Sequence, residues 1–293
     1  MIKSYKLRRI LSNTFIYILL AVLGLIWISP LVYMIIHSFR ADGGAFYSHI
    51  LPWTDKNGVK YTLQNYIDLF TKADNTANFP QWFLNTFIIA IFSCVISTLA
   101  VLMVSYAFSR LRFKARKPMI NIGMILGMFP GFMTMIAIYY LLKAMGLLAM
   151  PQLALIICYS AGAGLGYQIS KGFFDTIPRA LDEAATIDGA TKNQIFWKII
   201  LPMSKPILVY TILTSFIGPW TDFILAKIIV GAQGQQNYTV AIGLQIFIDQ
   251  EHKAQYFKQF LAGSVVVAVP ISALFLFLQR YYVEGVTAGG VKG

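Results

Sequence analysis

Residues 181–202 read Leu-Asp-Glu-Ala-Ala-Thr-Ile-Asp-Gly-Ala-Thr-Lys-Asn-Gln-Ile-Phe-Trp-Lys-Ile-Ile-Leu-Pro. This polar stretch lies between two apolar runs, each of which is long enough to cross a membrane. A polar element of this size between two apolar runs predicts a docking element for another protein. The runs that flank it predict a membrane fold.

The composition also indicates a bilayer protein. The chain has 293 residues, of which 57% are hydrophobic and 12% are charged, against about 25% charged residues in an average soluble domain. A helix needs about 20 mostly apolar residues to cross the hydrocarbon core. We therefore expect an all-α polytopic membrane protein with six transmembrane helices. The expected spans are 14–39, 83–108, 119–142, 152–174, 206–230 and 259–281, which together make a membrane domain at 14–281.

The positive residues indicate the orientation, because Lys and Arg beside a span are retained in the cytoplasm. With residues 1–13 inside the cell, 16 of the 24 Lys and Arg residues are cytoplasmic. We therefore expect both termini, the tail at 282–293 and the loop at 175–205 in the cytoplasm. The basic loop at 110–117 fits this orientation and contact with anionic membrane lipid. The net charge of +12 therefore requires no nucleic acid.

No residue pattern predicts catalysis or metal binding. The sequence has no Gly-x4-Gly-Lys-Ser/Thr phosphate loop, no Gly-x-Ser-x-Gly turn and no His-Glu-x-x-His helix. Cys94 and Cys158 lie in apolar runs, where a thiol acts as a small hydrophobe. His37, His49 and His252 lack metal-ligand spacing. We expect no enzyme activity, no metal site and no cofactor bound by this chain.

The segment 175–205 is predicted to form two short helices joined by a turn. Gly189 can adopt the left-handed backbone conformation that commonly ends a helix. Residues 191–194 have the form of a capping box, which starts the second helix. Pro202 is expected to stop that helix, and Pro206 to open the next span.

The first of these helices has the chemistry of a docking surface. Its two small alanines let another protein approach closely, and Glu183 offers a charged acceptor for an arginine. The alternative is an amphipathic element that lies on the membrane surface. Asp182, Glu183 and Asp188 would be repelled there by an anionic leaflet, so docking is favoured.

The segment resembles the EAA loop of the permease subunits of bacterial ABC importers. The resemblance is carried by the motif Glu183-Ala184-Ala185, by Gly189 and by the ending Ile199-x-Leu201-Pro202. The resemblance covers about the whole chain and implies the type I, MetI-like architecture. It also implies that the loop forms a coupling helix, seated in a cleft of a separate ATP-binding subunit. The residues assigned to this coupling are Asp182, Glu183, Ala184, Ala185, Gly189, Ile199, Leu201 and Pro202.

The ending Glu284–Gly293 resembles the tail of maltose and maltodextrin permease subunits. This resemblance implies import of a maltodextrin-type oligosaccharide across the bacterial cytoplasmic membrane. The implied partners are a second, MalF-like permease subunit, a dimer of ATP-binding-cassette subunits that use ATP and Mg, and an external sugar-binding protein. The tail is expected to be extended and to contact the ATPase, although such an end is by itself typical of fraying. The tail residues concerned are Thr287, Gly289, Gly290 and Lys292.

Two further elements are candidates for function. By the same resemblance, the outer loop contacts the binding protein through Gly231, Gly234, Gln235, Gln236 and Asn237, whereas the stretch alone is typical of an idle flexible loop. Asp222 lies inside a span, where a charge costs roughly 2.5–3.5 kcal/mol. With Trp220 it is expected either at a subunit interface or along the transport pathway. Pro130-Gly131 and Pro270 predict bends in their spans.

Other substrates and another transport class remain open. A permease for another carbohydrate or for a glycerol-phosphate-type solute would carry the same loop. An ATP-independent channel or ion-coupled carrier would show further membrane acids or paired broken helices near the midplane. A membrane-bound scaffold or enzyme ranks third, because no catalytic constellation is present.

Overall fold

The structure, a computed structural model, describes residues 2–41, 61–72, 77–162, 166–231 and 233–290. Within these ranges all regular structure is helical, apart from one isolated antiparallel bridge between Arg40 and Tyr61. The expected all-α class is therefore confirmed. The chain divides into two compact units, Met1–Lys72 with Ile246–Val266 and Ala73–Gln245 with Val267–Gly293.

The first unit contains α1 (Ile2–Ser38), α2 (Gln64–Thr71) and the first part of α14 (Lys253–Gly290). The Asn65 amide donates to the carbonyls of Ser38 at 2.8 Å and Arg40 at 2.9 Å, which satisfies carbonyls at the end of α1. The apolar side chains of α1 between Ile10 and Val32 are exposed, and Trp27 is 80% exposed. Lipid or another subunit must cover this surface.

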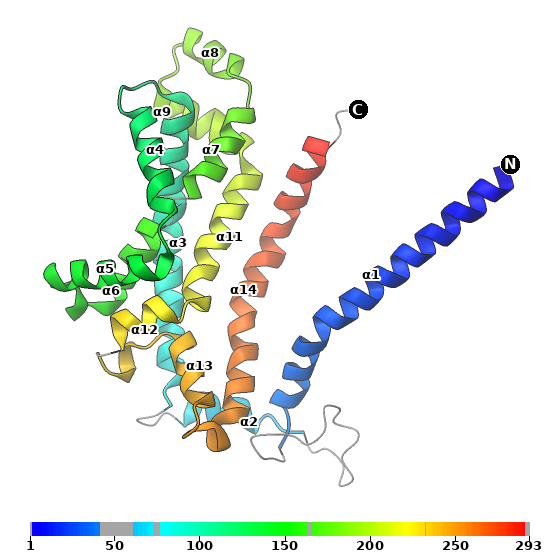
Figure 1. Cartoon of the computed structure of the whole chain (residues 1–293), viewed down its shortest axis with the longest axis vertical. Coiled ribbons are helices and arrows are strands. Elements are labelled where there is room, and N and C mark those ends of the chain that lie inside the picture. Colours follow the sequence, from blue (N-terminus) through cyan, green and yellow to red (C-terminus); the bar gives the residue numbers. More distant parts are fainter. Residues whose placement is uncertain (1, 42–60, 73–76, 163–165, 232, 291–293) are drawn as a thin grey trace. The chain divides into compact units, whose positions relative to one another are not determined.

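The second unit is built around α3 (Phe79–Arg110), which packs against α6, α7 and α11. Residues 175–205, for which a coupling role is expected and which are called the coupling segment below, lie at the carboxyl end of α3 (Figure 1). Helix α12 lies toward the amino end of α3. The other elements are α4 Arg116–Gly127, α5 Gly131–Ala144, η2 Leu147–Ala149, α6 Pro151–Gly162, α7 Tyr167–Thr176, α8 Ala180–Ile187, α9 Lys192–Ile195, η4 Phe196–Ile200, α10 Leu201–Met203, α11 Lys205–Thr221, α12 Ile224–Val230, η5 Gln235–Asn237 and α13 Val240–Ile248.

Three helical segments of the described chain are long and apolar enough to cross a membrane: Arg8–Ser38, Phe79–Arg110 and Gln255–Tyr281. Two bent pairs raise this number to five. They are Arg116–Gly127 with Gly131–Ala144, and Lys192–Met203 with Lys205–Thr221. The remaining expected span corresponds to α6 and α7, which flank positions 163–165 outside the described residues.

Prolines and one aspartate explain where the helices break. The bend expected at Pro130-Gly131 is confirmed, because α4 and α5 meet there at 106°. Pro270 lies inside the uninterrupted helix α14. The span expected at 206–230 breaks at Asp222, whose carboxylate accepts the first backbone N–H groups of α12.

The coupling segment has most of its expected local structure. Gly189 is left-handed with φ +81°, and the capping box at 191–194 is present, so both predictions are confirmed. The prediction for Pro202 is wrong, because the helix continues to Met203 and the chain then bends by 85°. A π-helical turn, η4, precedes this proline, and such a widened turn relieves the clash with the preceding carbonyl.

A glycine allows close packing near the amino end of α3. Trp82 is fully buried, and a methyl group added at Gly243 of α13 would overlap its indole ring. The backbone of α13 can therefore approach Trp82 only because Gly243 has no side chain.

We predict that Gly243→Ala lowers the free energy of unfolding by about 1–3 kcal/mol, because Trp82 must move out of a packed site. Thermal unfolding of the purified protein in detergent measures the effect. Gly172→Ala in α7 is the matched control, since a methyl group there meets nothing within 4 Å. Equal unfolding temperatures for both variants would contradict the packing account.

Candidate functional site

A buried apolar cluster holds the coupling segment against α3. Ala185 of α8 and Ile195 of α9 are buried in it, together with Leu102 and Tyr106 of α3. Burial of a large apolar side chain contributes roughly 1.5–3 kcal/mol, so the cluster stabilises the contact between the coupling segment and α3. The buried members of the cluster are Leu102, Tyr106, Phe174, Ile177, Ala185, Ile195, Phe196, Ile200 and Ile207.

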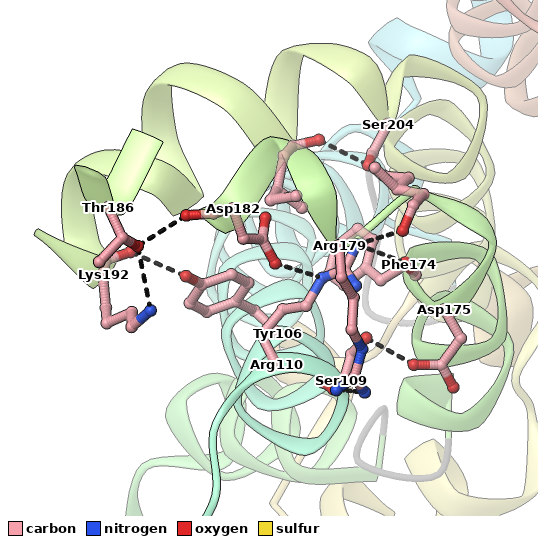
Figure 2. Close-up of polar contacts among 12 residues, drawn as sticks. Tyr106, Ser109, Arg110, Phe174, Asp175, Arg179, Asp182, Thr186, Lys192 and Ser204 are labelled. Atoms are coloured by element: carbon pink, nitrogen blue, oxygen red, sulfur yellow. Dashed lines mark hydrogen bonds and ion pairs between the residues drawn. The ribbon is translucent and has the colours of Figure 1, made fainter. Parts of the chain in front are cut away.

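Arg110, at the carboxyl end of α3, contacts both α7 and α8. Its Nη2 atom donates to the carbonyls of Phe174 at 2.9 Å and Ile177 at 2.8 Å. These two hydrogen bonds cap the carboxyl end of α7. Its Nε atom lies 3.2 Å from Oδ2 of Asp182 in α8, an ion pair shown in Figure 2. The Arg110 and Asp182 side chains are only 4% and 15% exposed, so solvent screens the pair little.

Two more residues on the same turn of α3 strengthen this connection (Figure 2). The Tyr106 hydroxyl donates to the Lys192 carbonyl at 2.9 Å, at the start of α9. The Ser109 hydroxyl donates to Asp175 Oδ1 at 2.6 Å, at the end of α7. Because positions i, i+3 and i+4 share a helix face, one turn of α3 contacts α7, α8 and α9.

The charge of Asp175 is fixed by its neighbours. Burial alone would raise the pKa of this carboxyl, but hydrogen bonds from Lys171 and Ser109 outweigh it and hold the pKa below its usual value. The Lys171 ammonium lies 2.6 Å from Asp175 Oδ2. The acceptor for Ser109 is therefore ionised at neutral pH.

Helix α8 has two different faces. Asp182 pairs with Arg110 and Ala185 is buried, so these residues of the motif face the protein's own core. Glu183 and Ala184 are exposed, and Ile187, one turn further along, is 87% exposed. Glu183, Ala184 and Ile187 therefore form the exposed face of α8.

The other residues assigned to coupling also divide into buried and exposed ones. Ile199 and Leu201 are partly buried against the apolar cluster. Pro202 is exposed, and Gly189 forms the turn between α8 and α9. Sequence reasoning missed Ile187, although its position three residues after Ala184 indicates the same helix face.

The described residues of the loop at 231–237 are hydrogen-bonded to α3 and α6. Asn85 of α3 donates to the Gln236 carbonyl at 2.7 Å, and the Trp82 indole donates to the Gln235 carbonyl at 2.9 Å. The Asn237 side chain accepts from Gln152 at 2.8 Å. Gly231 is partly buried, whereas Gly234 is exposed and has φ +89°. This loop therefore presents a fixed surface.

Asp222 and Trp220 have partners inside the chain. Asp222 accepts the Tyr159 hydroxyl at 2.7 Å as well as backbone N–H groups of α12. Trp220 is 3% exposed and lies edge-on to Phe83, with ring centroids 5.3 Å apart. Both residues stabilise the junction between α11 and α12.

The described part of the tail is helical. Thr287, Gly289 and Gly290 belong to α14, so the expected extended backbone is wrong for these residues. Lys292 lies outside the described residues. Among the described residues, no group of three or more His, Cys, Asp or Glu side chains could hold a metal ion.

We predict that Arg110→Met destabilises the protein more than Asp182→Asn. The methionine leaves a carboxylate and two helix-end carbonyls unpaired, at a cost of about 3–5 kcal/mol. The asparagine leaves the arginine bonded to both carbonyls, so its cost is about 1–3 kcal/mol. Thermal unfolding in detergent, with Arg112→Met as an exposed control, measures this order. A larger loss for Asp182→Asn would contradict the geometry.

The chain is similar in sequence to three transport permeases. GanQ of Bacillus subtilis, a galactooligosaccharide transport permease, is 33% identical over 100% of both chains. MalD of Streptococcus pneumoniae, a maltodextrin transport permease, is 32% identical over 99% of both chains. MdxG of Bacillus subtilis, also a maltodextrin transport permease, is 35% identical over 97% of this chain and 98% of its own.

A solved structure has the same fold. A chain of a bacterial ABC transporter for import of the acidic polysaccharide alginate superposes with a TM-score of 0.74, 21% identity and coverage of 93% of this chain and 96% of that chain. The sequence pattern of binding-protein-dependent transport system inner membrane components matches residues 96–287. The chain is thus a multi-pass membrane permease subunit and belongs to the family of inner membrane components of binding-protein-dependent transport systems.

Proposed function

We propose that this chain is half of the transport pathway of an ATP-driven importer for maltodextrin-type oligosaccharides. The observation that carries the proposal is the two-faced helix α8, fixed to α3 on one side and exposed on the other. Two of the three relatives above are named for maltodextrin, which supports this sugar class. A galactooligosaccharide is the second candidate, because GanQ is named for it.

The proposed partners follow from this role. A second, MalF-like permease subunit completes the pathway and covers apolar surface, and an external sugar-binding protein delivers the substrate. Two ATP-binding-cassette subunits bind ATP and Mg, whereas this chain binds neither. Both termini are proposed to lie in the cytoplasm of a bacterial cell, on the same side as α8.

The coupling mechanism uses the two faces of α8. Its exposed face, with Glu183, Ala184 and Ile187, docks on the ATPase, and Glu183 pairs there with a positive group. Its inner face, with Asp182 and Ala185, transmits the movement of the ATPase to α3. A rigid connection is required for this step, because a flexible loop would absorb the displacement.

The other contact surfaces are proposed from their position in the chain. The fixed loop with Gly234 and Gln236 exposed is suited to the binding protein on the outer side. The end of α14 is proposed to reach the ATPase from the inner side. Neither contact is needed for docking through α8.

The proposal predicts that ATPase subunits purify with this chain in mild detergent when the genes for the second permease and the ATPase are expressed with it. In proteoliposomes that also contain the binding protein, ATP should drive uptake of labelled maltotriose. Uptake driven by an ion gradient, without ATP, would instead identify a carrier. Uptake of glycerol phosphate and no saccharide would overturn the substrate class.

We predict that Glu183→Arg abolishes most ATP-driven uptake and weakens retention of the ATPase, because it puts a positive charge against the positive group of the partner. The variant should still insert and keep its unfolding temperature, since Glu183 is exposed. Glu251→Arg makes the same charge change at an exposed residue outside α8 and should transport normally. Normal uptake by the Glu183 variant would remove this residue from the docking face.

A further inference from the structure

A cavity of about 280 Å³ lies where α3, α6 and α11 meet. Ser97 of α3 lies in the middle of its span, so the cavity is at membrane depth. The lining residues are Ser97, Val101, Tyr159, Gly166, Tyr210, Thr211, Thr214, Ser215, Gly218 and Pro219. Six of these ten residues carry a side-chain hydroxyl group, and none of the ten is charged.

The cavity mainly offers hydrogen-bond acceptors. Thr211 donates its hydroxyl to the Ile207 carbonyl at 2.8 Å, and Thr214 donates to the Tyr210 carbonyl at 2.9 Å. Tyr159 donates to Asp222 at 2.7 Å. Because these protons are already used, the hydroxyl oxygens keep their lone pairs for another donor.

The helices leave space at this point instead of closing on each other. A methyl group added at Gly218 would meet nothing within 4 Å, and one added at Gly166 would meet only Val101 at 3.9 Å. Small and hydroxyl-bearing residues normally bring membrane helices into close contact. Here Ser97 and Ser215 do so, with their oxygens 3.1 Å apart, but the rest of the lining stays open.

The lining chemistry selects a class of ligand. A neutral saccharide brings many hydroxyl donors, and the rings of Tyr159 and Tyr210 add apolar faces for its C–H groups. An anionic solute would find no positive side chain among the lining residues, and an uncompensated charge at membrane depth is costly. The cavity therefore favours a sugar over a glycerol-phosphate-type solute.

We infer that this cavity is a passage site, at which hydroxyls of this subunit contact a neutral oligosaccharide during transport. The inference rests on the proposed importer function. It adds the residues that contact the sugar and the requirement that the substrate carries no charge. Thr211, Thr214, Ser215 and Gly218 recur at helical spacing, so one face of α11 forms most of the site.

The first test uses the complete transporter with its binding protein in proteoliposomes and labelled maltotriose. Thr214→Val and Tyr210→Phe should each reduce uptake about two- to tenfold, as expected for the loss of one hydrogen bond. Thr134→Val is the matched control, because Thr134 also donates to a carbonyl of its own helix but lies outside the cavity. Equal uptake by the control and both cavity variants would overturn the site.

The second test fills the cavity without removing a hydroxyl. Gly218→Leu should block uptake while stimulation of ATP hydrolysis by the binding protein is retained, and Gly172→Leu, at an exposed glycine outside the cavity, should transport normally. If Gly218→Leu transports as well as Gly172→Leu, the passage site is wrong. If the unmodified complex imports no saccharide at all, the proposed function fails instead.

The third test detects the sugar directly. In a chain with Cys94 and Cys158 replaced by serine, maltotriose should protect Thr214→Cys from a thiol reagent in the assembled transporter. Thr134→Cys should react at the same rate with and without the sugar. A Thr214→Cys variant that is not protected, and instead cross-links to the second permease subunit, would make the cavity part of the subunit interface and contradict the inference.

Discussion

One buried arginine joins the coupling segment of this permease to helix α3. Arg110 caps the carboxyl end of α7 and pairs with Asp182 of α8 from a side chain that is 4% exposed. A buried charge is stable only when it has partners, so the segment cannot move away from α3 without leaving this guanidinium unsatisfied. The position of α8 therefore depends on the last turn of α3.

This constraint gives helix α8 two different faces. Its inner face is used within the chain, through Asp182 and the buried Ala185, while Glu183 and Ile187 remain exposed. A docking helix that was held only by a loop could change its angle without moving the membrane domain. The apolar cluster and the hydrogen bonds of Tyr106 and Ser109 oppose such a change.

Local features were predictable from the sequence, and long-range contacts were not. The left-handed Gly189 and the capping box at 191–194 depend on residues within a few positions, so their chemistry is readable directly. The pairing of Arg110 with Asp182 joins distant segments, and no local pattern indicates it. For the same reason, no local pattern indicates that Asn85 and Trp82 of α3 hydrogen-bond to the carbonyls of Gln236 and Gln235. The inward orientation of Ala185 also depends on tertiary packing.

The distance between spin labels on α3 and α9 tests the central claim most directly. Labels at Met103 and Asn193, both exposed, would report on the complete transporter with and without ATP. If Arg110 and the cluster make the coupling segment and α3 one rigid body, the distance changes by less than about 2 Å between the two states. A change of about 5 Å, one helical turn, would show that the segment slides on α3 and would contradict the account.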